Sequence, residues 1–125
     1  MTDTSKSWVD STVNFGTSPP TCGVEIDVSA AKNKGIRWIA DRAGFTLTNV
    51  SVYEADGTTP ASGPGKEFWN VQTGTMPSPS NPAVTVSYMT IKDKVDTHDT
   101  YVYTGTYTDS SGTSGTFDPG IKNTD

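Results

Sequence analysis

The stretch from Ala83 to Thr108 constrains the fold of this chain more than any other. In it, valine and tyrosine alternate with small polar residues on both sides of a charged run, residues 92–99. Side chains two positions apart lie on one face of a β-strand, so this period predicts two strands that each bury one face. Because charged side chains are costly to bury, we expect the run between the strands to be the exposed connection of a hairpin. The alternating residues are Val84, Val86 and Tyr88 before the run, and Tyr101, Tyr103 and Tyr107 after it.

Other segments of the chain have the same β-strand pattern. Turn residues such as Asp56-Gly57 separate them at intervals of roughly ten residues, which is typical of β-sandwiches and barrels. In the segment that contains Asn49, the apolar residues change parity at that residue, which predicts a β-bulge or a crossing between sheets. Helix is expected at most as one short turn at Ser29–Gly35. The expected strands cover residues 9–15, 22–28, 36–40, 45–53, 66–75 and 113–117.

These patterns predict a single-domain, all-β antiparallel β-sandwich of about seven or eight strands, immunoglobulin-like or jelly-roll-like. The composition agrees, because only 32% of the 125 residues are hydrophobic while Gly, Pro, Thr and Ser are frequent. Three Trp, five Tyr and four Phe argue against disorder. We expect residues 1–20 to be a polar N-terminal segment that docks as an edge strand, and residues 21–125 to form the β-sandwich domain.

The charge of the chain limits its partners. The formal net charge is −5, and an acidic surface repels both the phosphate backbone of nucleic acids and anionic membranes. No segment approaches the roughly 18 apolar residues that a membrane-spanning helix needs. The first residues lack the basic and apolar regions of a secretory signal, so we expect a cytoplasmic protein or the mature form of a secreted one. A single cysteine, Cys22, rules out an internal disulfide.

No catalytic, nucleotide or cofactor motif is present, and we therefore expect a non-enzymatic protein without a cofactor. His98 is the only histidine, and we interpret it as a solvated loop residue rather than a general base. Three aspartates around it form a weak candidate calcium site, because Ca²⁺ prefers oxygen ligands. Their spacing does not match a defined calcium loop, and two lysines in the same run oppose a cation. The candidate calcium ligands are Asp93, Asp96 and Asp99.

Aromatic residues beside polar ones indicate a second kind of site. Trp69 follows Phe68, and adjacent residues of a strand point to opposite faces, so one of the two should lie outside the core. An exposed indole next to hydrogen-bonding groups could stack on a sugar or another flat ligand. The alternative is that most of the aromatic residues fill the core of a chain that is poor in Leu and Ile. The candidate ligand-binding residues are Trp69, Trp38, Arg37 and Asn70.

Two functions follow from these features. The first is a structural or assembly protein, or a protein-interaction module, that uses strand edges and the N-terminal segment to contact a second copy or another protein. The alternative is a module that binds carbohydrate or another small polar ligand through exposed Trp and Tyr side chains. The candidate interaction residues are Trp8, Val9, Val13 and Phe15.

Overall fold

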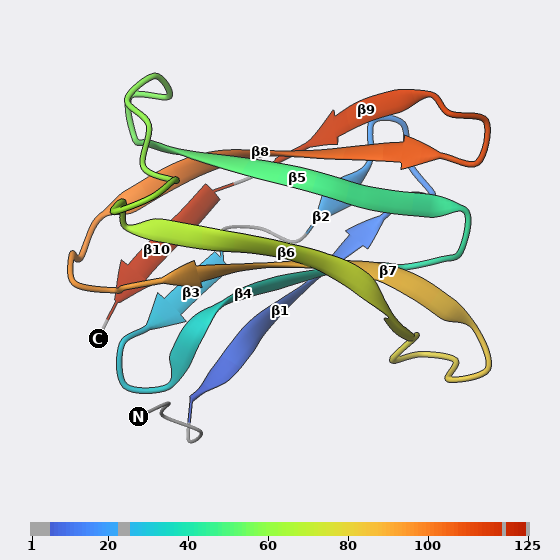
Figure 1. Ribbon diagram of the computed structural model, residues 1–125, viewed down its shortest axis with the longest axis horizontal. Helices are drawn as coiled ribbons and strands as arrows, with labels where there is room; N and C mark the ends of the chain where they lie inside the picture. Colours follow the sequence, from blue (N-terminus) through green and yellow to red (C-terminus); the bar gives the residue numbers. More distant parts are fainter. Residues whose placement is uncertain (1–5, 23–25, 119, 125) are drawn as a thin grey trace.

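The computed structural model describes residues 6–22, 26–118 and 120–124. These residues form ten β-strands and no helix, arranged in two five-stranded sheets (Figure 1). Sheet 1 contains β1 (Ser7–Asn14), β2 (Thr21–Cys22), β4 (Asn33–Ala40), β6 (Phe68–Pro77) and β7 (Thr85–Asp93). Sheet 2 contains β3 (Ile26–Ser29), β5 (Phe45–Glu54), β8 (Thr100–Asp109), β9 (Ser114–Phe117) and β10 (Gly120–Thr124).

Both sheets are mixed. Sheet 1 has the order β2-β1-β4-β7-β6, and sheet 2 has the order β3-β10-β8-β5, with β9 also paired to β8. β1 runs parallel to β4 in sheet 1, because the chain leaves this sheet after β2, forms β3 in sheet 2 and then returns into β4. In sheet 2, β3 runs parallel to β10. The all-β prediction is therefore confirmed, whereas a purely antiparallel arrangement of about seven or eight strands is wrong.

The hairpin predicted around residues 92–99 is not formed. β7 pairs with β4 and β6 in sheet 1, whereas β8 pairs with β5, β9 and β10 in sheet 2. The charged run crosses between the sheets, and Asp93 and Val95 within it are buried. Tyr88 is only half-buried, because the residues of β7 that face the core are Met89 and Ile91. Alternation predicted these strands correctly but not their partners, which depend on contacts distant in sequence.

The two sheets pack face to face through a core that both supply. Trp38 of β4 and Tyr103 of β8 meet across it, where the indole Nε1–H donates a 3.0 Å hydrogen bond to the tyrosine hydroxyl. Phe68 of β6 packs edge-to-face on Tyr101 of β8, with ring centroids 5.0 Å apart. Burial of such apolar side chains is the main favourable term in folding. The largest fully buried side chains are Trp38, Tyr103, Phe68, Ile36, Leu47, Met89, Ile91, Ile121, Val13, Val28, Val52 and Val86.

Three local predictions have different outcomes. The register between β5 and β8 shifts between Leu47 and Asn49, which confirms the predicted bulge. Of the residues predicted as a helical turn, Ser29–Gly35, only residues 30–32 form a turn, whereas Ser29 ends β3 and residues 33–35 begin β4. The strand predicted over residues 22–28 includes residues 23–25, which lie outside the described part of the chain, so it is described only as β2 and β3.

We expect Tyr103→Phe to lower the free energy of unfolding by about 1–3 kcal/mol, because the buried indole N–H of Trp38 loses its acceptor. Urea denaturation followed by tryptophan fluorescence measures this change. Tyr53→Phe, at a half-exposed position of β5, is the matched control and should change the value by less than about 0.5 kcal/mol. Equal stability of Tyr103→Phe and the wild type would contradict the importance of this hydrogen bond.

Candidate functional site

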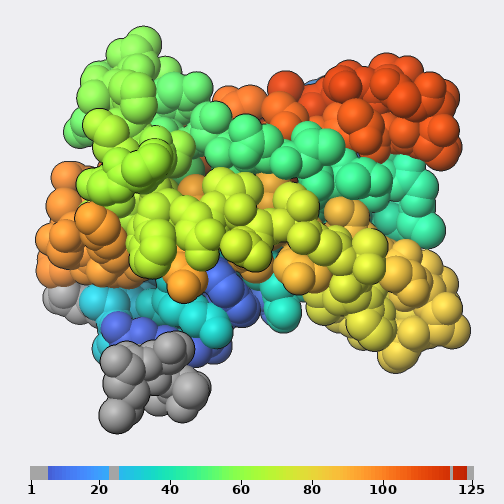
Figure 2. Space-filling view, in the orientation of Figure 1, coloured from blue at the N-terminus to red at the C-terminus, as the bar shows by residue number. Residues whose placement is uncertain are grey.

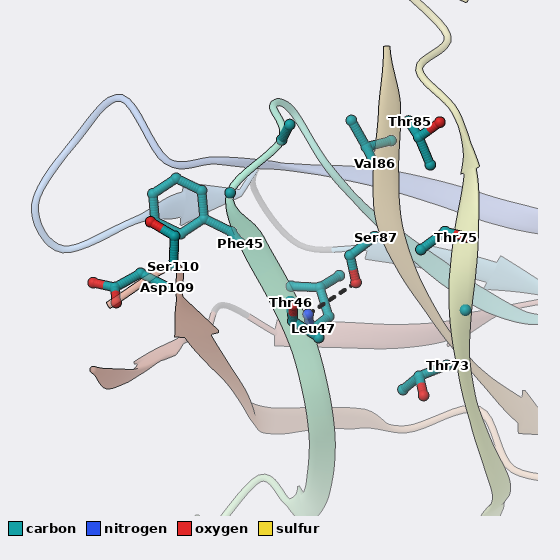
Figure 3. A pocket seen from close by; sticks show the side chains of 13 residues that line it. Phe45, Thr46, Leu47, Thr73, Thr75, Thr85, Val86, Ser87, Asp109 and Ser110 are labelled. Carbon is teal, nitrogen blue, oxygen red and sulfur yellow. Dashed lines mark hydrogen bonds between the residues drawn. The ribbon is translucent and has the colours of Figure 1, made fainter. Parts of the chain in front are cut away.

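A cleft of about 450 Å³ lies where β5 of sheet 2 faces β6 and β7 of sheet 1 (Figure 3). Inside it, Ser87 Oγ accepts a 2.9 Å hydrogen bond from the backbone N–H of Leu47. Of the described residues that line the cleft, only Asp109 is ionisable, and hydrogen bonds from Ser111 and Thr113 lower the pKa of its carboxyl group. General acid–base catalysis needs a proton donor and acceptor in position, and this lining does not supply such a pair. The hydroxyl-bearing residues of the lining are Thr46, Thr73, Thr75, Thr85, Ser87 and Ser110.

The outer face of sheet 1 offers more varied chemistry. The neighbouring residues in β4, β6 and β7 are buried in the core, so the side chains between them point outward. One row of such positions crosses four strands and includes two indoles. The register places in this row Trp8 of β1, Gly35 of β4, Lys92 of β7 and Trp69 of β6, which we call the tryptophan row.

Each indole of the tryptophan row has an ammonium group over its ring. Lys34 Nζ lies 4.9 Å from the ring centroid of Trp8, and Lys92 Nζ lies 4.9 Å from that of Trp69. Both distances are within the range of a cation–π interaction. Gly35 makes room for the first indole, because a Cβ there would lie 2.8 Å from Cζ3 of Trp8 and closer still to a backbone carbonyl of β7. A larger residue at this position would displace the ring.

A groove of about 460 Å³ runs beside the tryptophan row, and we call it the outer groove. Arg37 lines it and donates hydrogen bonds of 2.8 and 2.9 Å to the carboxylate of Asp10, which raise the pKa of the guanidinium. Asn70, at a bulge of β6 with a φ of 60°, also lines the groove and accepts a 3.0 Å hydrogen bond from Gln72. The site therefore combines charged and amide groups with aromatic faces. The other lining residues are Trp8, Met76, Tyr88, Thr90 and Lys92.

Positive charge is concentrated on this face. Five of the nine Lys and Arg residues line the outer groove or the smaller hollow next to it. Of the described residues here, the acidic ones are Asp93, in that hollow, and Asp10, which is paired with Arg37. Because the whole chain carries a net charge of −5, the sign of the charge is locally reversed, which favours an anionic ligand. The five cationic residues are Lys6, Lys34, Arg37, Lys92 and Lys94.

The structure brings together three of the four predicted ligand-binding residues. Arg37 and Asn70 line the outer groove, and Trp69 stands beside it with its side chain 39% exposed. Trp38 is instead fully buried and bonded to Tyr103, so it is not placed to bind a ligand. The sequence of the short strand predicted over residues 36–40 did not show which of its faces points inward. The lysines over the two indoles were missed, because their places above the rings depend on which strands lie side by side.

The four predicted interaction residues of the N-terminal segment separate into two pairs. β1 lies between β2 and β4, and its Val13 is buried in the core of this chain. Phe15, just beyond β1, is also buried and stacks on Phe45 with ring centroids 4.0 Å apart. These two residues stabilise the fold and are not available to a partner. Trp8 and Val9 are half-buried, but Val9 packs against the core, so Trp8 alone of the four remains a candidate for contact.

The predicted calcium ligands lie near a buried cluster of a different composition. Asn123 Nδ2 donates hydrogen bonds to Asp93 at 3.2 Å and to Glu67 at 3.1 Å, and the Asn123 backbone N–H donates one to the backbone carbonyl of Asp99. Burial, together with Asp96 and Asp93, raises the pKa of Glu67 to about 8. Among the described residues, no group of three or more His, Cys, Asp or Glu side chains is arranged to hold a metal ion. A protonated Glu67 beside Asp93 therefore accounts for the cluster without a cation.

The residues capable of base or nucleophile chemistry lie apart from the outer groove. His98 is exposed in the connection between β7 and β8. Cys22 is half-buried, with its Sγ 3.2 Å from the hydroxyl of Tyr103. Burial raises the pKa of the Cys22 thiol, which is the opposite of the lowering that activates a cysteine nucleophile.

Comparison with known proteins adds no functional assignment, since no protein-family model matches the chain and the search of curated proteins finds no match. In the described part of the chain, no helix has the length and apolar character needed to cross a membrane. The outer groove and the tryptophan row are the features of the structure that bear on function.

We expect the stability of the fold to decrease as the pH rises from 4.5 through about 8. The pKa of Glu67 is raised from its usual value of 4.5, so its contribution is fully present below pH 4.5 and is lost as the pH passes the folded-state value. Thermal unfolding across this range measures the effect. Glu67→Gln, which resembles the protonated side chain, should flatten the pH dependence, whereas Glu54→Gln at an exposed position should not. A Glu67→Gln profile identical to that of the wild type would contradict this assignment.

Proposed function

We propose that this protein is a non-enzymatic interaction module, a structural or assembly component whose contact surface is sheet 1. The observation that best supports this is the exposed indole of Trp69, in one row with a second indole from the N-terminal strand. Tryptophan and arginine are enriched where a partner covers a protein surface, and Arg37 lies in the adjoining groove. Since β1 supplies Trp8, the N-terminal segment forms part of this surface.

A strand edge of sheet 1 offers a route to self-assembly. β6 is the last strand of sheet 1, and none of its ten residues is charged. It lies at the surface along the middle of the face shown in Figure 2. Uncharged edge strands pair readily with other chains, so we favour β6 as the strand that meets a second copy. At its first residue, Phe68, β6 exchanges backbone hydrogen bonds with Ala61 and Gly63. At the edge of sheet 2, β5 donates backbone hydrogen bonds to other parts of the chain at three positions, Leu47, Val52 and Glu54.

We also propose that the two sheets form an immunoglobulin-like sandwich. That fold has seven strands, numbered here along the chain. Strands one, two, five and four form one sheet in that order, and strands three, six and seven form the sheet that faces it. The sets β1-β4-β7-β6 and β5-β8-β9 follow this order, with β2, β3 and β10 as additions. The parallel pairing of β1 with β4 departs from it, and a jelly-roll-like arrangement is the alternative.

The second candidate function is the binding of carbohydrate or another small polar ligand in the outer groove. Amide and hydroxyl groups at Asn70, Gln72 and Thr90 line the groove beside aromatic side chains. Sites for small ligands commonly combine apolar walls with a few polar groups that set orientation. This candidate uses the same face of sheet 1, and differs in its partner.

We expect the purified protein to self-associate and Thr75→Lys, at an exposed position of β6, to weaken the association at least about tenfold. If two copies pair along β6, the introduced lysine of one copy would lie close to the same lysine of the other, and the two positive charges would repel. Light scattering over a range of protein concentrations measures the change. Thr58→Lys, in an exposed turn, is the matched control and should behave as the wild type. A strict monomer at every concentration would remove self-assembly and leave ligand binding as the function of this face.

A further inference from the structure

The positive charge on the outer face of sheet 1 determines which ligands can bind there. Five cationic side chains gather there, and Asp10 is already engaged by Arg37. The other nearby carboxyl group, Asp93, is 6% exposed and turned into the core side of β7, where it accepts a hydrogen bond from the Val95 backbone. Lys34 and Lys92, in contrast, stand over the two indoles. An anionic ligand is favoured here over a neutral or cationic one.

The two indoles select for the shape of the ligand. Trp8 and Trp69 are three strand spacings apart, which corresponds to roughly 14 Å. A ligand that touches both must be elongated and must cross the middle of the sheet, at right angles to the strands. Backbone N–H and C=O groups of inner strands are already paired with their neighbours, so an extended peptide would gain no strand pairing along this path. Flat rings that stack on indoles suit it better.

The polar groups of the outer groove select for hydroxyl groups on the ligand. Asn70, Gln72 and Thr90 can each donate and accept hydrogen bonds, as sugar hydroxyls can. The carboxylate of Asp10 accepts hydrogen bonds only, and both of its oxygens already accept them from Arg37. The net charge of −5 acts against any polyanion, so hydrogen bonding to ring hydroxyl groups is what favours a sugar chain over a nucleic acid here.

We infer that the outer groove binds an acidic polysaccharide, a chain of sugar rings that carry carboxylate groups. Rings of the chain stack on Trp8 and Trp69, and its carboxylates pair with the ammonium groups of Lys34 and Lys92. Between the two indoles the chain crosses Gly35 and Lys92. The amide groups of Asn70 and Gln72, on the same strand as Trp69, bind hydroxyl groups of the ring next to that indole. This inference rests on the second candidate function, the binding of carbohydrate in the outer groove, and it adds the class of ligand.

The test uses the full chain and two probes that differ in charge alone. Oligogalacturonate carries one carboxylate per ring, and its methyl ester is the neutral counterpart. We expect calorimetric titration to show at least about tenfold tighter binding of the acid than of the ester, with the difference shrinking at high salt. Tryptophan fluorescence should change on binding, because two of the three indoles lie on the binding face.

Variants separate the role of charge from that of stacking. Lys92→Met keeps an apolar stem beside Trp69 but removes the ammonium group, and should weaken binding of the acid about fivefold without affecting the ester. Trp69→Ala should weaken binding of both probes about tenfold. Lys122→Met removes an exposed cation from β10 in sheet 2 and is the matched control, which should bind as the wild type. Thermal unfolding of each variant confirms that it is folded.

Each outcome supports or overturns the inference. Tight binding of the acid that depends on both Lys92 and Trp69 supports it. Equal affinity for acid and ester, or tighter binding of a single-stranded oligothymidylate than of either, overturns it. Failure to bind any of these probes overturns it as well, and if self-association persists and is lost in Thr75→Lys, the proposed function stands without it. A protein that stays monomeric and binds none of the probes would overturn both this inference and the proposed function.

Discussion

The contact between Trp38 and Tyr103 is the one on which the rest of the structure depends. It joins the two sheets at the centre of the core, through two rings tilted by 54° with centroids 5.0 Å apart and a 3.0 Å hydrogen bond. Burial raises the pKa of the Tyr103 hydroxyl, so this group stays neutral and available as an acceptor. If Tyr103 offered no acceptor, the buried indole N–H would be unpaired. The free energy cost would be of the same order as the stabilisation that the whole contact contributes. The sheets can therefore close only in the register that brings these two side chains together.

Closing the core also decides what the outer face of sheet 1 presents. Each strand that buries one set of alternating side chains must expose the other set. In β6 this buries Phe68 and exposes Trp69, and in β4 it buries Trp38 and leaves Arg37 at the surface. The outer face of sheet 1 is thus a consequence of packing on the opposite side of the same sheet. Gly35 is the one position in the tryptophan row where the backbone itself forms the floor, which makes room for Trp8.

The charged run after β7 shows how a polar sequence can enter a core. Lys92 and Lys94 line the outer surface, whereas Asp93 between them is buried, so the run keeps the alternation of a strand. The buried carboxyl group is tolerated because Val95 and Asn123 donate hydrogen bonds to it and Glu67 beside it holds a proton at neutral pH. The same alternation places the lysines where they add positive charge to the outer face.

The sequence alone determined most of the strands, though not β10, together with the bulge at Asn49 and the opposite orientations of Phe68 and Trp69, because each of these depends on side chains a few residues apart. It did not determine that Trp38 lies in the core or that β7 and β8 belong to different sheets. Of the outer face of sheet 1, it identified single residues such as Trp69 and Arg37, but not the lysines that accompany them. Which strands pair, and hence which residues share a face, was decided only by the tertiary structure, because the free energy of closing the core depends on contacts between segments far apart in the chain.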